Sequence, residues 1–116
     1  RGLSFKRYLD IAKLLRCKVA VVTDNDKDKQ RKCIDKYAEF AADDNIRIFY
    51  DSDEEKYTFE KVLYSINSEL CDRLFGEDAE LYMLNNKTEA AYKLLEQDCD
   101  VAVPDYIRGA IEWINE

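Results

Sequence analysis

The chain has 116 residues and a formal net charge of −7, with 47% hydrophobic and 37% charged residues, as is typical of one globular domain. It has no histidine, which excludes Ser-His-Asp and Cys-His catalysis and most zinc sites, and no apolar run reaches the ~20 residues of a membrane span. The acidic balance argues against a purely electrostatic grip on nucleic acid, although bound divalent ions reverse the local field in metal-dependent nucleases.

The first half of the sequence predicts alternating helices and strands. Helices are expected over 5–16 and 28–41, and parallel strands over 18–23 and 46–50. The strand over 18–23 is short, continuous and β-branched, so it is predicted to be buried on both faces of a sheet covered by helices. The first helix shows an apolar stripe of Tyr8, Ile11, Ala12 and Leu15.

The second half predicts a mainly helical segment. After a charged loop over 51–57, Thr58 is expected to cap a long helix that ends at Gly76. A connection over 77–85, with at most a short helical turn, leads to a helix over 86–96 that a capping box of Asn86 and Glu89 begins. Pro104 opens the last helix, whose predicted inner face is Ile107, Ala110, Ile111 and Ile114. Since two strands do not make a stable sheet, we expect either further strands from upstream sequence or a helix-rich α/β piece that folds alone.

The chain starts without an initiator Met or a signal peptide, so we expect an excised piece of a longer cytoplasmic protein. Its four cysteines form no CxxC pair, which favours reduced thiols. They are Cys17, Cys33, Cys71 and Cys99.

The segment KVAVVTDNDKD places an acidic cluster at the carboxyl end of the first predicted strand, the edge at which open α/β sheets bind ligands. In an extended chain Asp24 and Asp26 would point the same way, and paired carboxylates suit Mg²⁺, Mn²⁺ or Ca²⁺. The plainer interpretation is a polar turn that caps a helix. A calcium loop fits poorly, because Lys29 stands where that loop needs glycine. A haloacid-dehalogenase-type phosphatase is a further alternative, although Lys27 and Asp28 follow where that family has Gly-Thr or a similar pair.

Several short motifs together resemble a toprim domain of the overcoming-lysogenization-defect (OLD) family of ATP-dependent nucleases. VVTDNDKD resembles the toprim DxD motif, and Thr58-Phe59-Glu60 resembles that family's [ST]-x-E element. Lys87 in NNKTEAA resembles its late lysine, and Gly2-Leu3-Ser4-Phe5 also fits the family pattern. One departure is that no Glu-Gly turn precedes the first helix. The family's ATPase domain is also missing from the sequence.

The resemblance implies a toprim-like, Rossmann-like parallel sheet flanked by helices, as a single C-terminal domain over 1–116. It implies that Asp24 and Asp26 bind Mg²⁺ or Mn²⁺, that Glu60 binds or orients a second ion, and that Thr58 donates its hydroxyl to that shell. Lys87 would stabilise charge on the scissile phosphate, and Asp28 would be an accessory ligand or a helix cap.

The implied partners are DNA, the ATPase domain of the same chain and further copies of the full-length protein. ATP would act only through that ATPase domain. No membrane partner is implied. The expected reaction is cleavage of DNA phosphodiester bonds, and we expect this 116-residue piece alone to be inactive. A topoisomerase or primase domain and a non-catalytic interaction domain remain as alternatives.

Overall fold

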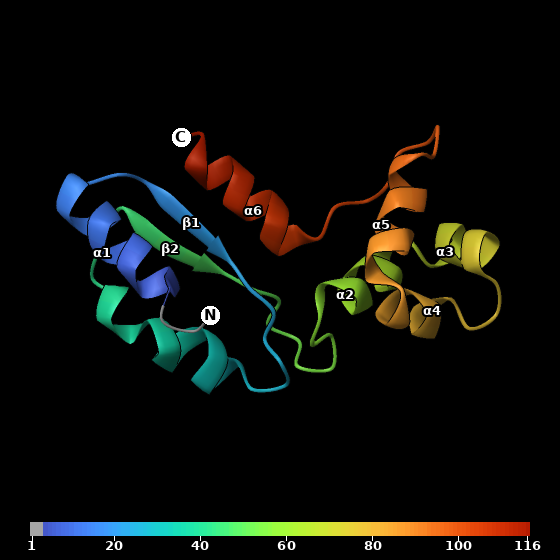
Figure 1. The fold of residues 1–116 in the computed structure, drawn as a ribbon, viewed down its shortest axis with the longest axis horizontal. Coiled ribbons are helices and arrows are strands. Elements are labelled where there is room, and N and C mark those ends of the chain that lie inside the picture. The colour runs from blue at the N-terminus through green and yellow to red at the C-terminus, as the bar shows by residue number, and fades with distance from the viewer. Residues whose placement is uncertain (1–3) are drawn as a thin grey trace.

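The chain folds into two lobes that lie end to end along a long axis, and its overall extents are 47 × 28 × 22 Å (Figure 1). The computed structural model describes residues 4–116, so Gly2 and Leu3 of the family-like motif lie outside the described residues. The sheet lobe comprises α1 (Ser4–Leu15), β1 (Val19–Val22), η1 (Gln30–Ile34), η2 (Asp35–Phe40), β2 (Ile46–Phe49) and α6 (Asp105–Ile114). The helical lobe comprises α2 (Phe59–Ile66), α3 (Ser68–Phe75), α4 (Ala79–Asn85) and α5 (Lys87–Leu95). The fold is therefore α/β, with a two-stranded parallel sheet flanked by helices.

The two strands form the middle layer of the sheet lobe. Their register pairs Val19 with Ile46 and Val22 with Phe49. Because successive side chains of a strand face opposite ways, Val19, Val21, Ile46 and Ile48 form one face, which packs against α1 and η2. The opposite face lies against α6, where Trp113 meets Phe49 at 6.0 Å between ring centroids.

Strand β1 is less buried than predicted. Every residue of β1 is half-buried except Val22, which is 47% exposed, so the prediction of a strand buried on both faces was wrong. In a two-stranded sheet each strand has one unpaired edge, and this leaves part of each strand open to solvent. The stripe predicted for α1 was also shifted: α1 buries Leu9 and Ala12, whereas Tyr8, Ile11 and Leu15 are exposed.

The helix predicted over 28–41 is wound irregularly. It consists of a π-helical turn, η1, followed by a 3₁₀ segment, η2, with a kink at Tyr37, where φ is −111° and ψ is 16°. This winding places Cys33, Tyr37 and Phe40 in the core, while Ile34 is exposed.

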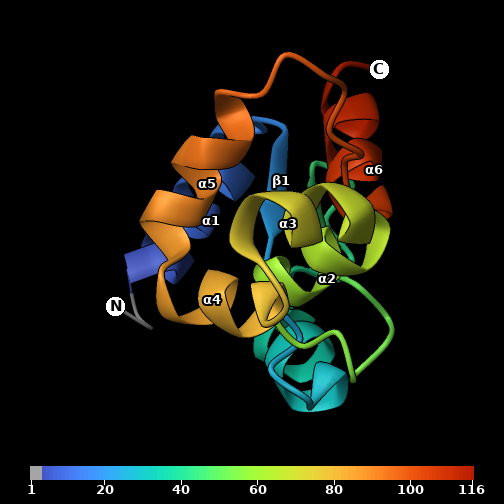
Figure 2. The ribbon, with the colours of Figure 1, turned by 90° about the vertical axis from the view of Figure 1, so that its right-hand side faces the viewer.

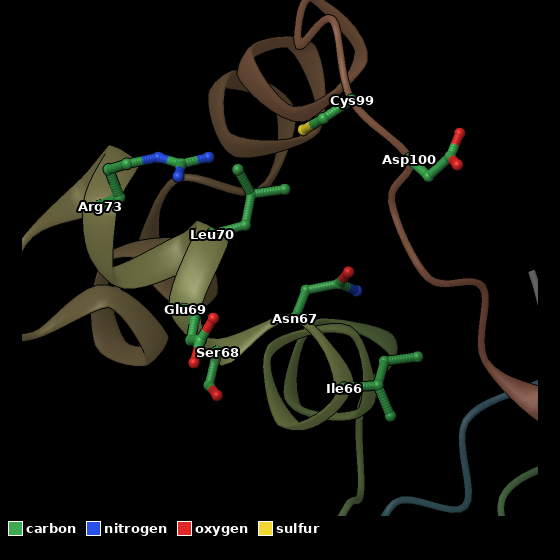
Figure 3. Close-up of a pocket in the computed structure, with 8 residues that line it drawn as sticks. All are labelled: Ile66, Asn67, Ser68, Glu69, Leu70, Arg73, Cys99 and Asp100. Carbon is green, nitrogen blue, oxygen red and sulfur yellow. The ribbon is translucent and has the colours of Figure 1, made fainter.

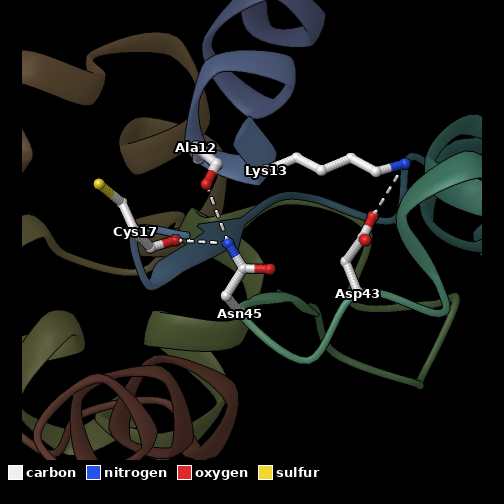
Figure 4. Close-up of polar contacts among 5 residues, drawn as sticks. All are labelled: Ala12, Lys13, Cys17, Asp43 and Asn45. Atoms are coloured by element: carbon white, nitrogen blue, oxygen red, sulfur yellow. Dashed lines mark hydrogen bonds and ion pairs between the residues drawn. The ribbon is translucent and has the colours of Figure 1, made fainter. Parts of the chain in front are cut away.

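An asparagine joins the end of α1 to the start of β2. The Asn45 side-chain amide donates to the carbonyls of Ala12 at 3.1 Å and Cys17 at 2.8 Å (Figure 4). Beside it, Lys13 and Asp43 form an ion pair at 3.7 Å. These contacts hold the end of α1 against the segment that leads into β2.

The helical lobe is built around its own core, and Figure 2 looks onto α2–α5 from that end of the molecule. The buried cluster is Leu63, Leu70, Cys71, Ala79, Met83, Ala90 and Leu94. Thr58 caps α2 as predicted, since its hydroxyl accepts from the Lys61 N–H, and α3 ends at Gly76, whose φ is +87°. The residues 79–85 form a full helix, α4, rather than the connection that was predicted.

The single long helix predicted from Thr58 to Gly76 is broken at Asn67. The buried Asn67 side chain donates to the carbonyls of Leu63 and Ala102 and accepts from the Ala102 N–H at 2.8 Å. A side chain that takes over backbone hydrogen bonds ends the helix at that point. The Asn67 side chain also joins the helical lobe, through Ala102, to the linker that leads to α6.

Two further predictions were wrong in detail. Asn86 does not form a capping box, because its side-chain amide donates back to the Tyr82 carbonyl. On α6 the buried residues are Tyr106, Ala110 and Trp113, so the inner face is rotated from the predicted one and Ile111 is exposed. None of the helices within residues 4–116 combines the length and the apolarity that crossing a membrane requires.

Candidate functional site

The acidic cluster lies where β1 ends, in a tight turn. Asp26 and Lys27 both have left-handed φ values, +50° and +67°, so the chain is no longer extended there. The expectation that Asp24 and Asp26 point the same way therefore rested on a wrong premise: Asp24 is half-buried and Asp26 is exposed. The Asp28 carboxylate accepts the Arg31 N–H at 3.2 Å, one residue before the N-cap position of η1, Lys29.

Asn25, between the two aspartates, holds this turn against the loop after β2. It is 1% exposed, and its amide nitrogen donates to the carbonyls of Asp51 at 2.8 Å, Asp53 at 3.0 Å and Lys56 at 3.3 Å. Its side-chain oxygen accepts the Lys27 N–H at 2.9 Å. No role was predicted for Asn25, although asparagine is one of the residue types that favour turns.

Asp24 joins the sheet lobe to the helical lobe. Its carboxylate accepts the backbone N–H of Phe59 at 2.9 Å, in the first turn of α2. Burial raises the pKa of the Asp24 carboxyl; the Phe59 hydrogen bond opposes this rise, and the negative charges of Asp26 and Glu60 add to it. A smaller opposing effect comes from Lys87, so three other predicted charged residues, Asp26, Glu60 and Lys87, act on this carboxylate.

Glu60 and Lys87 meet across the helical lobe. The Lys87 ammonium lies 3.3 Å from the Glu60 carboxylate, although the two residues belong to different helices. The Glu60 side chain is 15% exposed and that of Lys87 is 58% exposed. The ion pair thus has a shielded acid in the first turn of α2, beside Asp24, and a cation open to solvent at the start of α5.

Tyr106 and Asp51 lie in the same region, although Tyr106 was not predicted as a site residue and Asp51 was expected in a charged loop. Tyr106 is buried on α6, and burial, followed by the charges of Asp24, Asp51 and Glu60, raises the pKa of its hydroxyl to about 12. A cavity of about 430 Å³ is lined by Tyr50, Asp51, Ser52, Asp105 and Tyr106. Asp24, Glu60 and Lys87 do not line this cavity, so the charge effect on Tyr106 is what relates it to them.

Cations surround an aromatic ring beside the acids. The ammonium groups of Lys27 and Lys61 lie 4.3 Å and 5.0 Å from the centroid of Tyr57, whose carbonyl accepts the Asp26 N–H. Lys61 also pairs with Glu80 at 2.8 Å. Positive groups thus stand close to the carboxylates although the whole chain is acidic.

The carboxylates are ligands of the type that a hard divalent cation prefers, but they do not enclose such an ion. Among residues 4–116, no three His, Cys, Asp or Glu side chains converge closely enough to hold a metal ion on their own. Mg²⁺, however, commonly takes one or two carboxylates and keeps several waters. Asp24 and Glu60, which flank the start of α2, fit that kind of partly hydrated site.

The cavity shown in Figure 3 is a different place. It has a volume of about 390 Å³ and lies between α3, the break at Asn67 and the segment around Cys99. None of the predicted site residues lines it, and its polar side chains include Glu69 and Arg73. It adds nothing to the acidic site.

Comparisons with family models, with curated proteins and with solved structures give no match for this chain.

Proposed function

We propose that this chain is a toprim-like, metal-dependent endonuclease domain that cleaves DNA phosphodiester bonds, as in the OLD-family ATP-dependent nucleases. The observation that carries the proposal is the meeting of Glu60 and Lys87 beside Asp24. These residues were selected from three separate motifs, and nothing in their spacing requires that they share one site.

The residues would divide the work of phosphodiester hydrolysis. Asp24 and Glu60 would hold Mg²⁺ or Mn²⁺, with Asp26 in an outer position because it is exposed, and Thr58 next to Glu60. Such an ion supplies charge neutralisation on the phosphate and an activated water. Lys87, whose ammonium is open to solvent, would leave Glu60 and pair with a phosphate oxygen as negative charge develops.

The test compares two lysines of α5 in the intact protein that carries this chain. Lys87→Ala should abolish plasmid cleavage with Mg²⁺ or Mn²⁺ while metal affinity stays nearly unchanged, since its charge serves the phosphate. Lys93→Ala is the matched control, because Lys93 lies on the same helix and forms its ion pair with Glu89 rather than with a predicted site residue. Asp24→Ala should remove both cleavage and metal binding. Equal cleavage by the two lysine variants would contradict the proposal.

A non-catalytic interaction domain is the second candidate, and one observation favours it. Asp24 accepts the Phe59 N–H and Glu60 is paired with Lys87, so both acids have partners within the protein. Under this alternative, the variants Asp24→Ala and Lys87→Ala would lower stability and leave divalent-metal affinity unchanged. Mn²⁺ titrations beside urea denaturation separate the two candidates.

A further inference from the structure

An apolar groove lies where the helical lobe meets α6. It is a cavity of about 490 Å³ whose ten lining residues are all apolar. They come from α2, from α5, from the linker over 101–104 and from the first turn of α6, and Figure 1 shows this linker passing from α5 to α6. On its walls Leu95 is 85% exposed and Val103 is 43% exposed, so no layer of residues 4–116 covers these side chains.

A stripe on α6 continues this groove. Ile107 lines the groove, and Ile111 and Ile114 lie on the same side of the helix, because residues three and four apart are neighbours on a helix surface. Ile111 is 54% exposed and Ile114 is 38% exposed, since α6 packs on the sheet through a different stripe. The exposed apolar surface thus extends from the end of α5 along the whole of α6.

The backbone of the linker has few free hydrogen-bonding groups. The Asn67 side chain takes both the N–H and the carbonyl of Ala102. The Val103 carbonyl accepts from the Arg108 side chain, and Pro104 has no N–H. An extended peptide would therefore find few backbone partners here. Recognition depends on side chains instead, as it does when the apolar face of an amphipathic helix enters a groove.

The charges around this surface select the kind of helix. Between residues 96 and 116 the chain has six acids and one base, Arg108, which pairs with Asp105 at 3.4 Å. Glu96 and Asp98, which closely follow Leu95 of the groove wall, are both exposed. Such an acidic rim repels a second copy of the same surface, anionic lipid headgroups and DNA, whereas it attracts lysine and arginine.

We propose that the groove and the α6 stripe form a docking surface for a cationic amphipathic helix of a partner protein. The apolar side chains of that helix enter the groove beside Leu95 and Ile107, and its flanking cations face the acids that follow Leu95. The inference goes beyond the proposed function and does not rest on it, because neither a metal ion nor the Glu60–Lys87 pair takes part in the docking.

The probe is a synthetic Leu/Lys peptide of about 18 residues with a helical period, which is long enough to form a helix. Fluorescence anisotropy in the presence of EDTA measures its binding, so the proposed metal site does not contribute. Leu95→Ser should weaken binding about tenfold, because the peptide then buries one leucine less. Leu14→Ser is the matched control, since Leu14 is 82% exposed on α1 and lies outside the groove. It should change the affinity less than about twofold.

A second pair of variants tests the acidic rim. Glu96→Gln together with Asp98→Asn should weaken peptide binding severalfold at low salt and less at high salt, because exposed charges act through a screened attraction. Glu77→Gln together with Asp78→Asn removes the same two charges from the exposed turn between α3 and α4 and should have a smaller effect.

The proposal is overturned by any of the following results. Equal binding by the Leu95 and Leu14 variants would show that the groove is not used. Equal binding of a shuffled Leu/Lys peptide, which keeps the charge but has no apolar stripe, would show that only charge is recognised. A dimer seen by light scattering, or retention on phosphatidylserine vesicles, would assign the surface to a second copy or to a membrane if Leu95→Ser abolished it.

Discussion

The two lobes differ in how they bury their apolar surface. The helical lobe has seven buried residues in one cluster, contributed by four consecutive helices, and several of them are almost inaccessible. The buried cluster of the sheet lobe has four residues, and its central strands are half-buried at best along β1. The core of the helical lobe is thus formed by helices that follow one another in sequence, whereas the core of the sheet lobe needs elements from both ends of the chain.

This difference places the candidate site on a boundary. Asp24 and Asp51 come from the open lobe, and Glu60 and Lys87 come from the closed one. The Asp24 bond to Phe59 crosses between them, and Asn25 anchors the loop that connects them. A site built this way takes an ion pair from one lobe and, from the other, acids whose position depends on a few hydrogen bonds.

The largest expected effect is on the core of the helical lobe. Met83 is 1% exposed on α4, so Met83→Ala should cost about 2–5 kcal/mol through the cavity that it leaves. Leu81→Ala on the same helix is the control, since Leu81 is exposed and should change stability by less than about 0.5 kcal/mol. Urea denaturation followed by circular dichroism measures both. Equal effects would mean that this lobe is not closed.

The next largest expected effect is a difference in cysteine alkylation rate between the two lobes. Cys17 and Cys99 are exposed, whereas Cys33 and Cys71 are buried. Burial, then the charges of Asp26 and Asp24, raises the pKa of the Cys33 thiol to about 11, so at pH 8 its thiolate fraction is on the order of 10²-fold below that of an ordinary cysteine. Raising the pH toward that pKa should speed its alkylation.

The comparison of lobes then adds an order of exposure. As urea is added, Cys33 of the sheet lobe should become reactive at a lower concentration than Cys71 of the helical lobe. Alkylation followed by mass spectrometry gives both rates from one sample. The reverse order would contradict the view that the sheet lobe is the more open of the two.

The Asn25 anchor should have a smaller, local effect. Asn25→Ala leaves the carbonyls of a connecting loop without their donor, which should cost about 1–3 kcal/mol. Hydrogen exchange over residues 51–57 should rise more than exchange in α4. Asn85→Ala, at an exposed position, is the control and should be nearly neutral. Unchanged exchange in the loop would show that Asn25 does not hold it.

The smallest expected effect concerns the Glu60–Lys87 pair. Because the lysine side chain is 58% exposed, Lys87→Met should change the free energy of unfolding by less than about 1 kcal/mol. A urea denaturation curve is sufficient to measure this. A loss above about 2 kcal/mol would show that the pair is structural and would favour the non-catalytic alternative.

Features of this fold that depend on neighbouring residues were predictable from the sequence. The Thr58 cap, the end of α3 at Gly76 and the two parallel strands follow from residue type and short apolar patterns, and the structure confirms them. The break at Asn67 was not predictable, because its partner Ala102 is 35 residues away. The partial exposure of β1 was missed for a related reason: a strand pattern does not record how many neighbours the strand has.

The candidate site divides in the same way. Asp24, Glu60 and Lys87 were selected by motif and lie together, whereas the predicted alignment of Asp24 with Asp26 failed because two left-handed residues turn the chain. Tyr106 was missed because a tyrosine on a helix stripe is ordinarily core. Its place near the acids depends on α6 returning to the sheet after the helical lobe.

That return of α6 has a consequence for synthesis. The chain leaves the sheet after β2, forms the whole of the helical lobe, and only then supplies the helix that covers the second face of the sheet. On the ribosome the four helices of the inserted lobe can therefore close while Phe49 and its neighbours still face solvent. During that interval the nascent chain exposes an apolar two-stranded ribbon, so this is the stage at which we expect chaperone binding or aggregation.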